Sequence, residues 1–205
     1  MSNLADTEQK VYRSATGVDE FYYGEVGEGT VADYIERVKF LQTINVEMPQ
    51  EITRARGDNK TAEMAVSSGD IAVTAGFHKI PLQDKQRLLG LEVVDGLTAM
   101  GSEDNPPYVA VVFAKTHEDG SREYVGLTKG LFTRPNITGQ TKGETTEFST
   151  EEIAAQFMDR ELEGFDKEKS VIFGYDLAGQ TTQRDKLFQK VFGMPYPTAT
   201  IPEGA

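Results

Sequence analysis

The chain has 205 residues, of which 38% are hydrophobic and 26% are charged, and its formal net charge is −12 at pH 7. This length and balance predict a single soluble domain with one substantial core and flanking arms. Cysteine is absent, which excludes disulfides, thiolate nucleophiles and thiolate metal sites. The acidic balance argues against stable nucleic-acid binding, because a protein that clamps a phosphate backbone needs clustered Lys and Arg.

Neither a membrane span nor a signal peptide is predicted. The longest apolar run, residues 108–114, has seven residues, too few to cross a bilayer. The start, "MSNLADTEQKVYRS", lacks the charged and apolar regions of a signal peptide, so we expect the mature chain to begin at or near Met1 and to be made in a cytoplasm.

Three segments show the period-two alternation of strands that bury one face. Their apolar sets are Val38, Phe40, Ile44, Val46 and Met48; Ile71, Val73, Ala75 and Phe77; and Val171, Phe173, Tyr175 and Leu177. Several antiparallel strands of this kind predict a mainly β protein, either a sandwich or a barrel.

The stretch "DNPPYVAVVF" predicts a β-hairpin. Pro106 and Pro107 lack backbone N–H groups and therefore mark the entrance of a strand over 108–115. Asp119 and Gly120 are expected to supply the positive φ angles of a tight turn, and residues 123–128 form the returning strand.

Two helices are predicted, one short and flanking, the other near the C-terminus. The first lies near residues 81–90, with Pro81 at its first position and Gly90 just past its end. Leu82, Leu88 and Leu89 are expected on one side of it. The second carries the apolar stripe Leu187, Phe188, Val191 and Phe192 and ends at Gly193. The proline-rich tail that follows is expected to be an extended arm.

Residues 149–157 allow two interpretations. Ser149 followed by Glu152 matches a capping box and favours a helix, whereas Ile153, Ala155 and Phe157 alternate as in a strand. Residues 49–63 and 1–17 are polar and without a core pattern, so we predict loops that are either disordered or used for contact.

No constellation of residues predicts catalysis, a cofactor or a metal. His78 and His117 are the only histidines and have no ligand spacing. The order of Gly24, Gly27 and Gly29 in "GEVGEG" is not that of a nucleotide-binding loop, and "GQTKGET" lacks the Walker spacing. Acidic neighbours such as Glu151 and Glu152, or Asp58 and Glu63, are expected from composition alone.

Four stretches in this order resemble major tail proteins of long-tailed, non-contractile bacteriophages (siphophages). They are "GVDEFYYGEV", "SSGDIAVTAGFHKIPLQDKQRLLGLEVVDG", "DNPPYVAVVFAKTHEDGSREYVGLTKGLFTRP" and "KGETTEFSTEEIAAQF". The resemblance extends over roughly residues 17–158. Its most characteristic parts are the helical segment 80–90 and the hairpin that begins at residue 105.

The resemblance implies a tail-tube fold assembled as hexameric rings that stack into a hollow virion tube. The tube would enclose a tape-measure protein, meet tail-tip and tail-terminator proteins and let double-stranded DNA pass without stable binding. It also implies a strand for 148–157. The implied organisation is an N-terminal arm (1–17), a β-domain (18–178) that includes an inter-ring loop at 49–63, and a C-terminal helix and arm (179–205).

Contact residues follow from these assignments. The loop would meet the next ring through Arg54, Arg56, Asp58, Asn59, Lys60 and Glu63. Its arginines are too few to bind nucleic acid and fit acidic surfaces of neighbouring subunits. The tip of the predicted hairpin offers His117, Glu118 and Asp119 as a second contact.

Three other functions remain as alternatives. The tube protein of a contractile tail or secretion system shares the fold by resemblance. A carboxylate-based hydrolase would need two acidic groups in one cleft, and a carbohydrate-binding β-sandwich usually displays Trp, which is absent.

Overall fold

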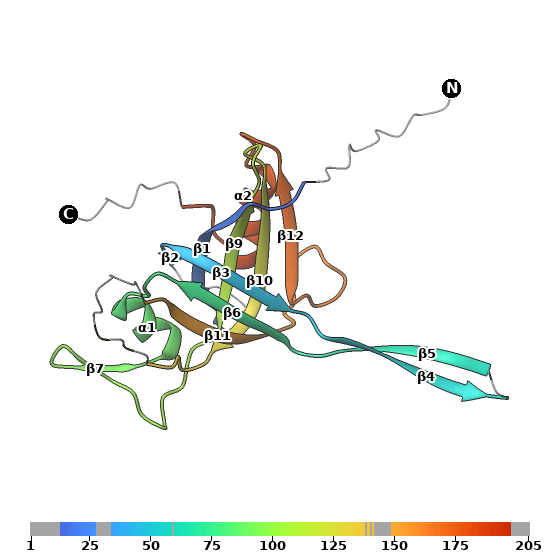
Figure 1. Cartoon of the computed structure of the whole chain (residues 1–205), viewed down its shortest axis with the longest axis horizontal. Helices are drawn as coiled ribbons and strands as arrows, with labels where there is room; N and C mark the ends of the chain where they lie inside the picture. The colour runs from blue at the N-terminus through green and yellow to red at the C-terminus, as the bar shows by residue number, and fades with distance from the viewer. Residues whose placement is uncertain are drawn as a thin grey trace.

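The computed structural model describes residues 13–27, 34–58, 60–137, 139, 141 and 149–197. Within these residues the chain forms an eight-stranded antiparallel sheet, two separate two-stranded sheets and two helices (Figure 1), so the prediction of a mainly β fold is confirmed. The elements are β1 (Gly17–Glu25), β2 (Glu36–Val38), β3 (Leu41–Glu47), β4 (Gln50–Gly57), β5 (Lys60–Ser68), β6 (Ile71–Phe77), α1 (Leu82–Leu89), β7 (Glu92–Val94), β8 (Leu97–Ala99), β9 (Val109–Thr116), β10 (Arg122–Phe132), β11 (Glu151–Met158), β12 (Val171–Asp176) and α2 (Thr182–Phe192).

The main sheet has the order β2-β1-β9-β10-β11-β6-β3, and β12 pairs with β10 beside this path. The long strand β10 pairs with two strands along one of its edges. Residues 122–127 pair with β12, and residues 129–132 pair with β11. The sheet curves until β3 also contacts β1. A barrel-like enclosure results, and it holds the main core.

The inward side chains of β6 behave as their alternation predicts. Ile71, Val73, Ala75 and Phe77 are all buried in the main core. Phe40 does not follow its predicted strand, because it has a φ of 64°, separates β2 from β3 and is 72% exposed.

Helix α1 closes the main core near β1. Leu88 and Leu89 are buried there, but Leu82 is exposed, so the predicted apolar side of this helix was wrong at its first turn. Pro81 is the N-cap residue rather than the first helical residue, and Gly90 ends the helix with a φ of 61°. The Tyr23 hydroxyl donates a hydrogen bond to Asp84 at 2.6 Å, which ties α1 to β1.

Helix α2 covers the outer face of the sheet over β9, β10 and β12. Its predicted stripe is confirmed, because Leu187, Phe188, Val191 and Phe192 are all buried in a second cluster. Met194 and Tyr196 pack against the same cluster. The part of the tail up to Tyr196 is therefore docked on the domain, and residues 198–205 lie outside the described residues.

Strand β12 keeps its predicted inner face only at its start, where Val171 packs against the main core. Ile172 packs against α2, and a Cβ at Gly174 would lie 3.2 Å from Gln183. Phe173 and Leu177 are exposed instead. The helix approaches closely only because glycine occupies the facing position.

The remaining predictions concern three segments. Residues 149–157 contain strand β11, with Ile153, Ala155 and Phe157 buried, so the strand interpretation is confirmed. The hairpin of β9 and β10 is also confirmed, although Gly120 has a positive φ and Asp119 does not. Residues 49–63 are not a loop but most of a β-hairpin formed by β4 and β5.

Candidate assembly surfaces

The β4–β5 hairpin leaves the barrel as a separate arm (Figure 1), hereafter the arm, residues 50–68. It is anchored at its base, where the backbone N–H of Gly69 donates to the Pro49 carbonyl at 3.0 Å. Strand β5 has nine residues, so the arm extends about 30 Å at roughly 3.3 Å per residue. Every arm side chain that the structure describes is exposed.

Alternation along the strands gives the arm two chemically different faces. Residues that pair across an antiparallel ladder share a face, and the register pairs Ile52 with Val66 and Arg54 with Met64. Ile52, Met64 and Val66 are 56%, 62% and 60% exposed. We call this side, with Arg54 and Arg56, the basic face.

The opposite face of the arm is acidic and polar. It carries Glu51, Thr53, Ala55, Glu63, Ala65 and Ser67, with Glu51 paired to Ser67 and Ala55 to Glu63, and Lys60, which is paired to Gly57, is its one cation among the described residues. The basic face therefore combines apolar side chains with two guanidinium groups and has no carboxylate among its described residues.

Of the predicted contact residues in this segment, Arg54, Arg56, Asp58, Lys60 and Glu63 all lie on the arm, and Asn59 lies outside the described residues. Asp58 forms the turn with a φ of 50°. Sequence reasoning missed Ile52, Met64 and Val66, although the spacing Met64–Val66 is a strand signal of period two.

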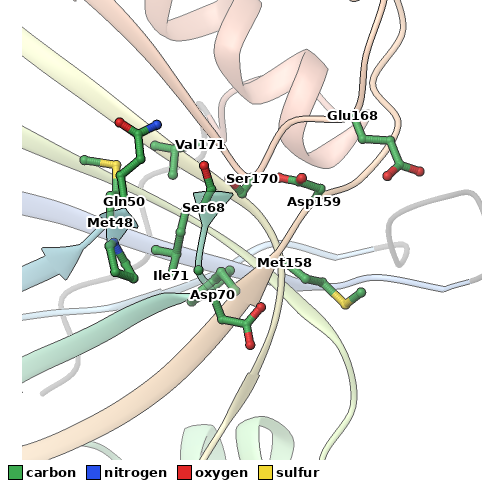
Figure 2. A pocket seen from close by; sticks show the side chains of 13 residues that line it. Met48, Gln50, Ser68, Asp70, Ile71, Met158, Asp159, Glu168, Ser170 and Val171 are labelled. Atoms are coloured by element: carbon green, nitrogen blue, oxygen red, sulfur yellow. The ribbon is translucent and has the colours of Figure 1, made fainter. Parts of the chain in front are cut away.

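A groove lies at the base of the arm, between β4, β5, β11 and β12 (Figure 2). It has a volume of about 490 Å³. Its apolar lining comprises Met48, Pro49, Ile71, Phe157, Met158 and Val171, and its polar lining comprises Gln50, Ser68, Gly69, Asp70, Asp159, Glu168 and Ser170. Three carboxylates thus border the groove and no cation lines it. We call it the acidic groove.

The tip of the β9–β10 hairpin is held by its own subunit. Asp119 accepts hydrogen bonds from the Ser121 hydroxyl at 2.6 Å and the Ser121 backbone at 3.1 Å, and it pairs with Arg13 at 3.1 Å. The two hydrogen bonds from Ser121 are the main cause of a lowered pKa of Asp119, and the charge of Arg13 lowers this pKa further. His117 Nδ1 lies 3.2 Å from the Ser14 carbonyl, and its ring packs edge-on against Tyr175. The predicted contact role of His117, Glu118 and Asp119 stays a prediction.

The acidic neighbours noted in the sequence do not form a catalytic pair. Glu151 binds Lys85 at 2.7 Å, whereas Glu152 is exposed and follows it in a strand, so the two side chains point to opposite faces. In the described part of the chain, no three His, Asp or Glu side chains gather to hold a metal. None of the described helices is long and apolar enough to span a membrane.

The arm thus exposes an apolar face and lies beside a groove whose charge is opposite to that of its basic face. A family model described as phage tail tube protein matches residues 39–198. The chain belongs to the phage tail tube protein family, which is structural and not enzymatic, and it is accordingly a component of the virion tail.

Two solved structures show distant similarity. One is described as the cryo-EM structure of the anti-feeding prophage cap (AFP tube terminating cap), with 13% identity, coverage of 86% of this chain and 100% of that chain, and a TM-score of 0.45. The other is the anti-feeding prophage (AFP) baseplate, 6-fold symmetrised, with 10% identity, 80% and 97% coverage, and a TM-score of 0.44. No curated protein sequence matches the chain.

Proposed function

We propose that the chain polymerises as stacked hexameric rings that form the tail tube of a long-tailed, non-contractile phage and conduct double-stranded DNA during ejection. The observation that carries this proposal is the arm, which exposes Ile52, Met64 and Val66 along a ribbon that no described element of its own subunit covers. An isolated two-stranded ribbon is marginally stable in water. Packing on a neighbour supplies the missing cover, and family membership supports a tube as the product.

The parts of the chain take separate roles in this tube. The β-domain (18–178) forms the ring wall, and the arm reaches from it to the next ring. Residues 1–17 and the end of the tail beyond Tyr196 overlap neighbouring subunits, whereas α2 and Tyr196 dock on the domain of their own subunit. The β9–β10 tip with His117, Glu118 and Asp119 makes a second contact.

The acidity of the chain fits a conduit for DNA. A net charge of −12 per subunit opposes adhesion of a polyanion, because like charges repel within about 10 Å at moderate salt. The lumen holds the tape-measure protein during assembly. Tail-tip and tail-terminator proteins bind the two ends of the tube.

Electron microscopy of the concentrated protein, alone and with tail-tip proteins, tests the proposal. We expect hollow tubes whose cross-sections have sixfold symmetry. Virions that contain this chain should show the tube without a surrounding sheath, and a sheath would support the contractile-tail alternative. Subunits that stay monomeric under all these conditions would refute the proposed polymerisation.

Deletion of residues 52–62 tests the role of the arm. We expect the variant to fold, because no arm side chain contributes to either core cluster, but to form no stacks. Circular dichroism and sedimentation measure the two properties. Thr53→Ala with Ser67→Ala, on the acidic face, is the control and should polymerise normally. If the deletion variant formed normal tubes, the arm would not be required for the contact between rings.

A further inference from the structure

The acidic groove has the chemistry of a receptor for a basic, partly apolar ligand. Its floor includes Ile71 and Phe157, which are buried, and its rim includes Met48 and Met158, which are exposed. Figure 2 shows Met48, Gln50 and Ser68 on one side of the groove, and Asp159 and Glu168 on the other. Methionine side chains adapt to irregular partners.

Among the described residues, no ion pair neutralises the charges of the groove. Eight ion pairs occur among the described residues, and none includes Asp70, Asp159 or Glu168. The same is true of Arg54 and Arg56 on the arm. Two sets of opposite charge, each beside exposed apolar side chains, are therefore available for contact with each other.

The arm cannot fill the groove of its own subunit. Gln50 borders the groove, and Arg54 lies four residues farther along β4, which places it about 13 Å away while the strand stays extended. The pairing of β4 with β5 holds the strand in that state. A basic face that reaches an acidic groove must therefore come from another copy.

We infer that the basic face of the arm, with Arg54 and Arg56, docks in the acidic groove of a second copy of this chain. This inference rests on the proposed function, because it names the receptor for the inter-ring arm. Face and groove are different surfaces, so the contact is heterologous. Repeated from ring to ring without closing on itself, such a contact generates an open stack that has free grooves at one end and free arms at the other.

Charge reversal tests the pairing. Asp70→Lys with Asp159→Lys in the groove, and Arg54→Glu with Arg56→Glu on the arm, should each lower the polymer yield by about tenfold or more, because like charges at a contact cost several kcal/mol. All four substitutions in one chain should restore at least about half of the wild-type yield. Glu51→Lys with Glu152→Lys is the control: both residues are exposed outside the basic face and the groove, the charge change equals that of the groove reversal, and the yield should stay unchanged.

Three outcomes separate the hypotheses. If the two reversals polymerise like wild type, or the combined variant does not recover, the groove is not the receptor of the arm. If the deletion of residues 52–62 still forms tubes, the proposed role of the arm fails, whatever the reversals do. Recovery only with an added tail-tip protein would assign the groove to that partner and overturn the self-contact.

Disulfide trapping provides a measurement that does not depend on polymer yield. The chain has no cysteine, so Arg56→Cys with Asp159→Cys introduces the only thiols. Oxidation of the concentrated double variant should give a ladder of covalent multimers, whereas either single variant should stop at dimers. A double variant that gives only dimers would contradict the proposed contact.

Discussion

At the scale of the residue, two glycines determine how closely the layers of the domain approach. A Cβ on Gly126 would lie 2.7 Å from Val191 of α2, and a Cβ on Gly130 would lie 2.5 Å from the Gln156 carbonyl oxygen and 2.6 Å from the Phe157 ring. Gly130 also sits at a register shift between β9 and β10. A side chain at either position forces packed groups apart.

Gly130→Ala should lower the free energy of unfolding by about 1–3 kcal/mol, because the methyl group meets backbone and a buried ring that have no room to move. Urea denaturation measures the loss. Gly101→Ala is the control, since the nearest atom to a Cβ there is Asp104 Oδ1 at 3.7 Å. If the two variants were equally stable, β10 and β11 would be able to move apart around the added methyl group without a loss in the free energy of unfolding.

Glu151 links the start of β11 to the start of α1. It accepts a bond from Lys85 Nζ at 2.7 Å and from the Ile80 backbone at 3.0 Å. Burial alone would raise its pKa, but the two hydrogen bonds together with the positive charges of Lys85 and Lys79 outweigh burial and lower the pKa. The stability from this pair is therefore present above the unfolded pKa and is lost as pH falls through the folded pKa.

Glu151→Gln should lower the free energy of unfolding by about 0.2–1 kcal/mol at neutral pH, as expected for a partly exposed pair. The difference from wild type should shrink as the pH falls from the ordinary pKa of a glutamate towards the lower pKa of Glu151 in the folded protein. Denaturant midpoints at neutral pH and at about pH 3 provide the test. A difference that stays constant over this range would show that ionisation of Glu151 does not stabilise the fold.

At the scale of the element, α2 forms a second core on the outer face of the sheet. Phe188 is fully buried there, and its ring packs 5.3 Å from Tyr22, 5.4 Å from Phe192 and 4.9 Å from Tyr196 between centroids. Arg184 lies over the ring of Tyr196 at 3.7 Å. Aromatic contacts therefore join both the helix and the residues after it to the sheet.

Phe188→Ala should cost about 3–5 kcal/mol of stability, because it removes a buried aromatic ring and leaves a cavity. Lys186→Ala, at an exposed position on the same helix, should change stability by less than about 0.5 kcal/mol. Thermal and chemical denaturation distinguish these results. A small effect of Phe188→Ala would mean that α2 contributes little to the folded domain.

At the scale of the whole molecule, the arm differs from the barrel in its dependence on neighbours. The barrel holds a main core and the outer cluster under α2, whereas the arm is exposed on both faces. Local opening has a low free energy where few apolar contacts are buried. Residues 50–68 of the free subunit should therefore be less protected than the barrel.

Trypsin should cut the free subunit at Arg54, Arg56 or Lys60 before it cuts at barrel positions such as Arg122, and assembly should protect these arm sites by about tenfold or more. Mass spectrometry of the fragments identifies the sites. The reference is the extent of cleavage in unassembled protein, in which trypsin is inactivated after the same digestion times as in the tubes. Equal cleavage of the arm in subunits and tubes would show that the arm stays uncovered after assembly.

Elements whose signals are local could be predicted from the sequence. Alternation located β6 and the β9–β10 hairpin, and helical spacing with glycine ends located α1 and α2, because burial of one face imposes its period on the chain. The family resemblance resolved 149–157 in favour of a strand. Absent cysteine and the net charge of −12 limited the classes of function before any fold was known.

Tertiary structure alone decided which faces are covered and what surfaces result. Phe173 follows the alternation of a strand, but it is exposed because α2 covers the opposite face, on the side of Ile172. The arm buries neither of its faces, so burial imposed no strong apolar pattern on residues 50–68. The acidic groove joins Met48 and Asp70 to Asp159 and Glu168, residues distant in the chain. Local periodicity has no information about such contacts, because they exist only once the sheet has curved.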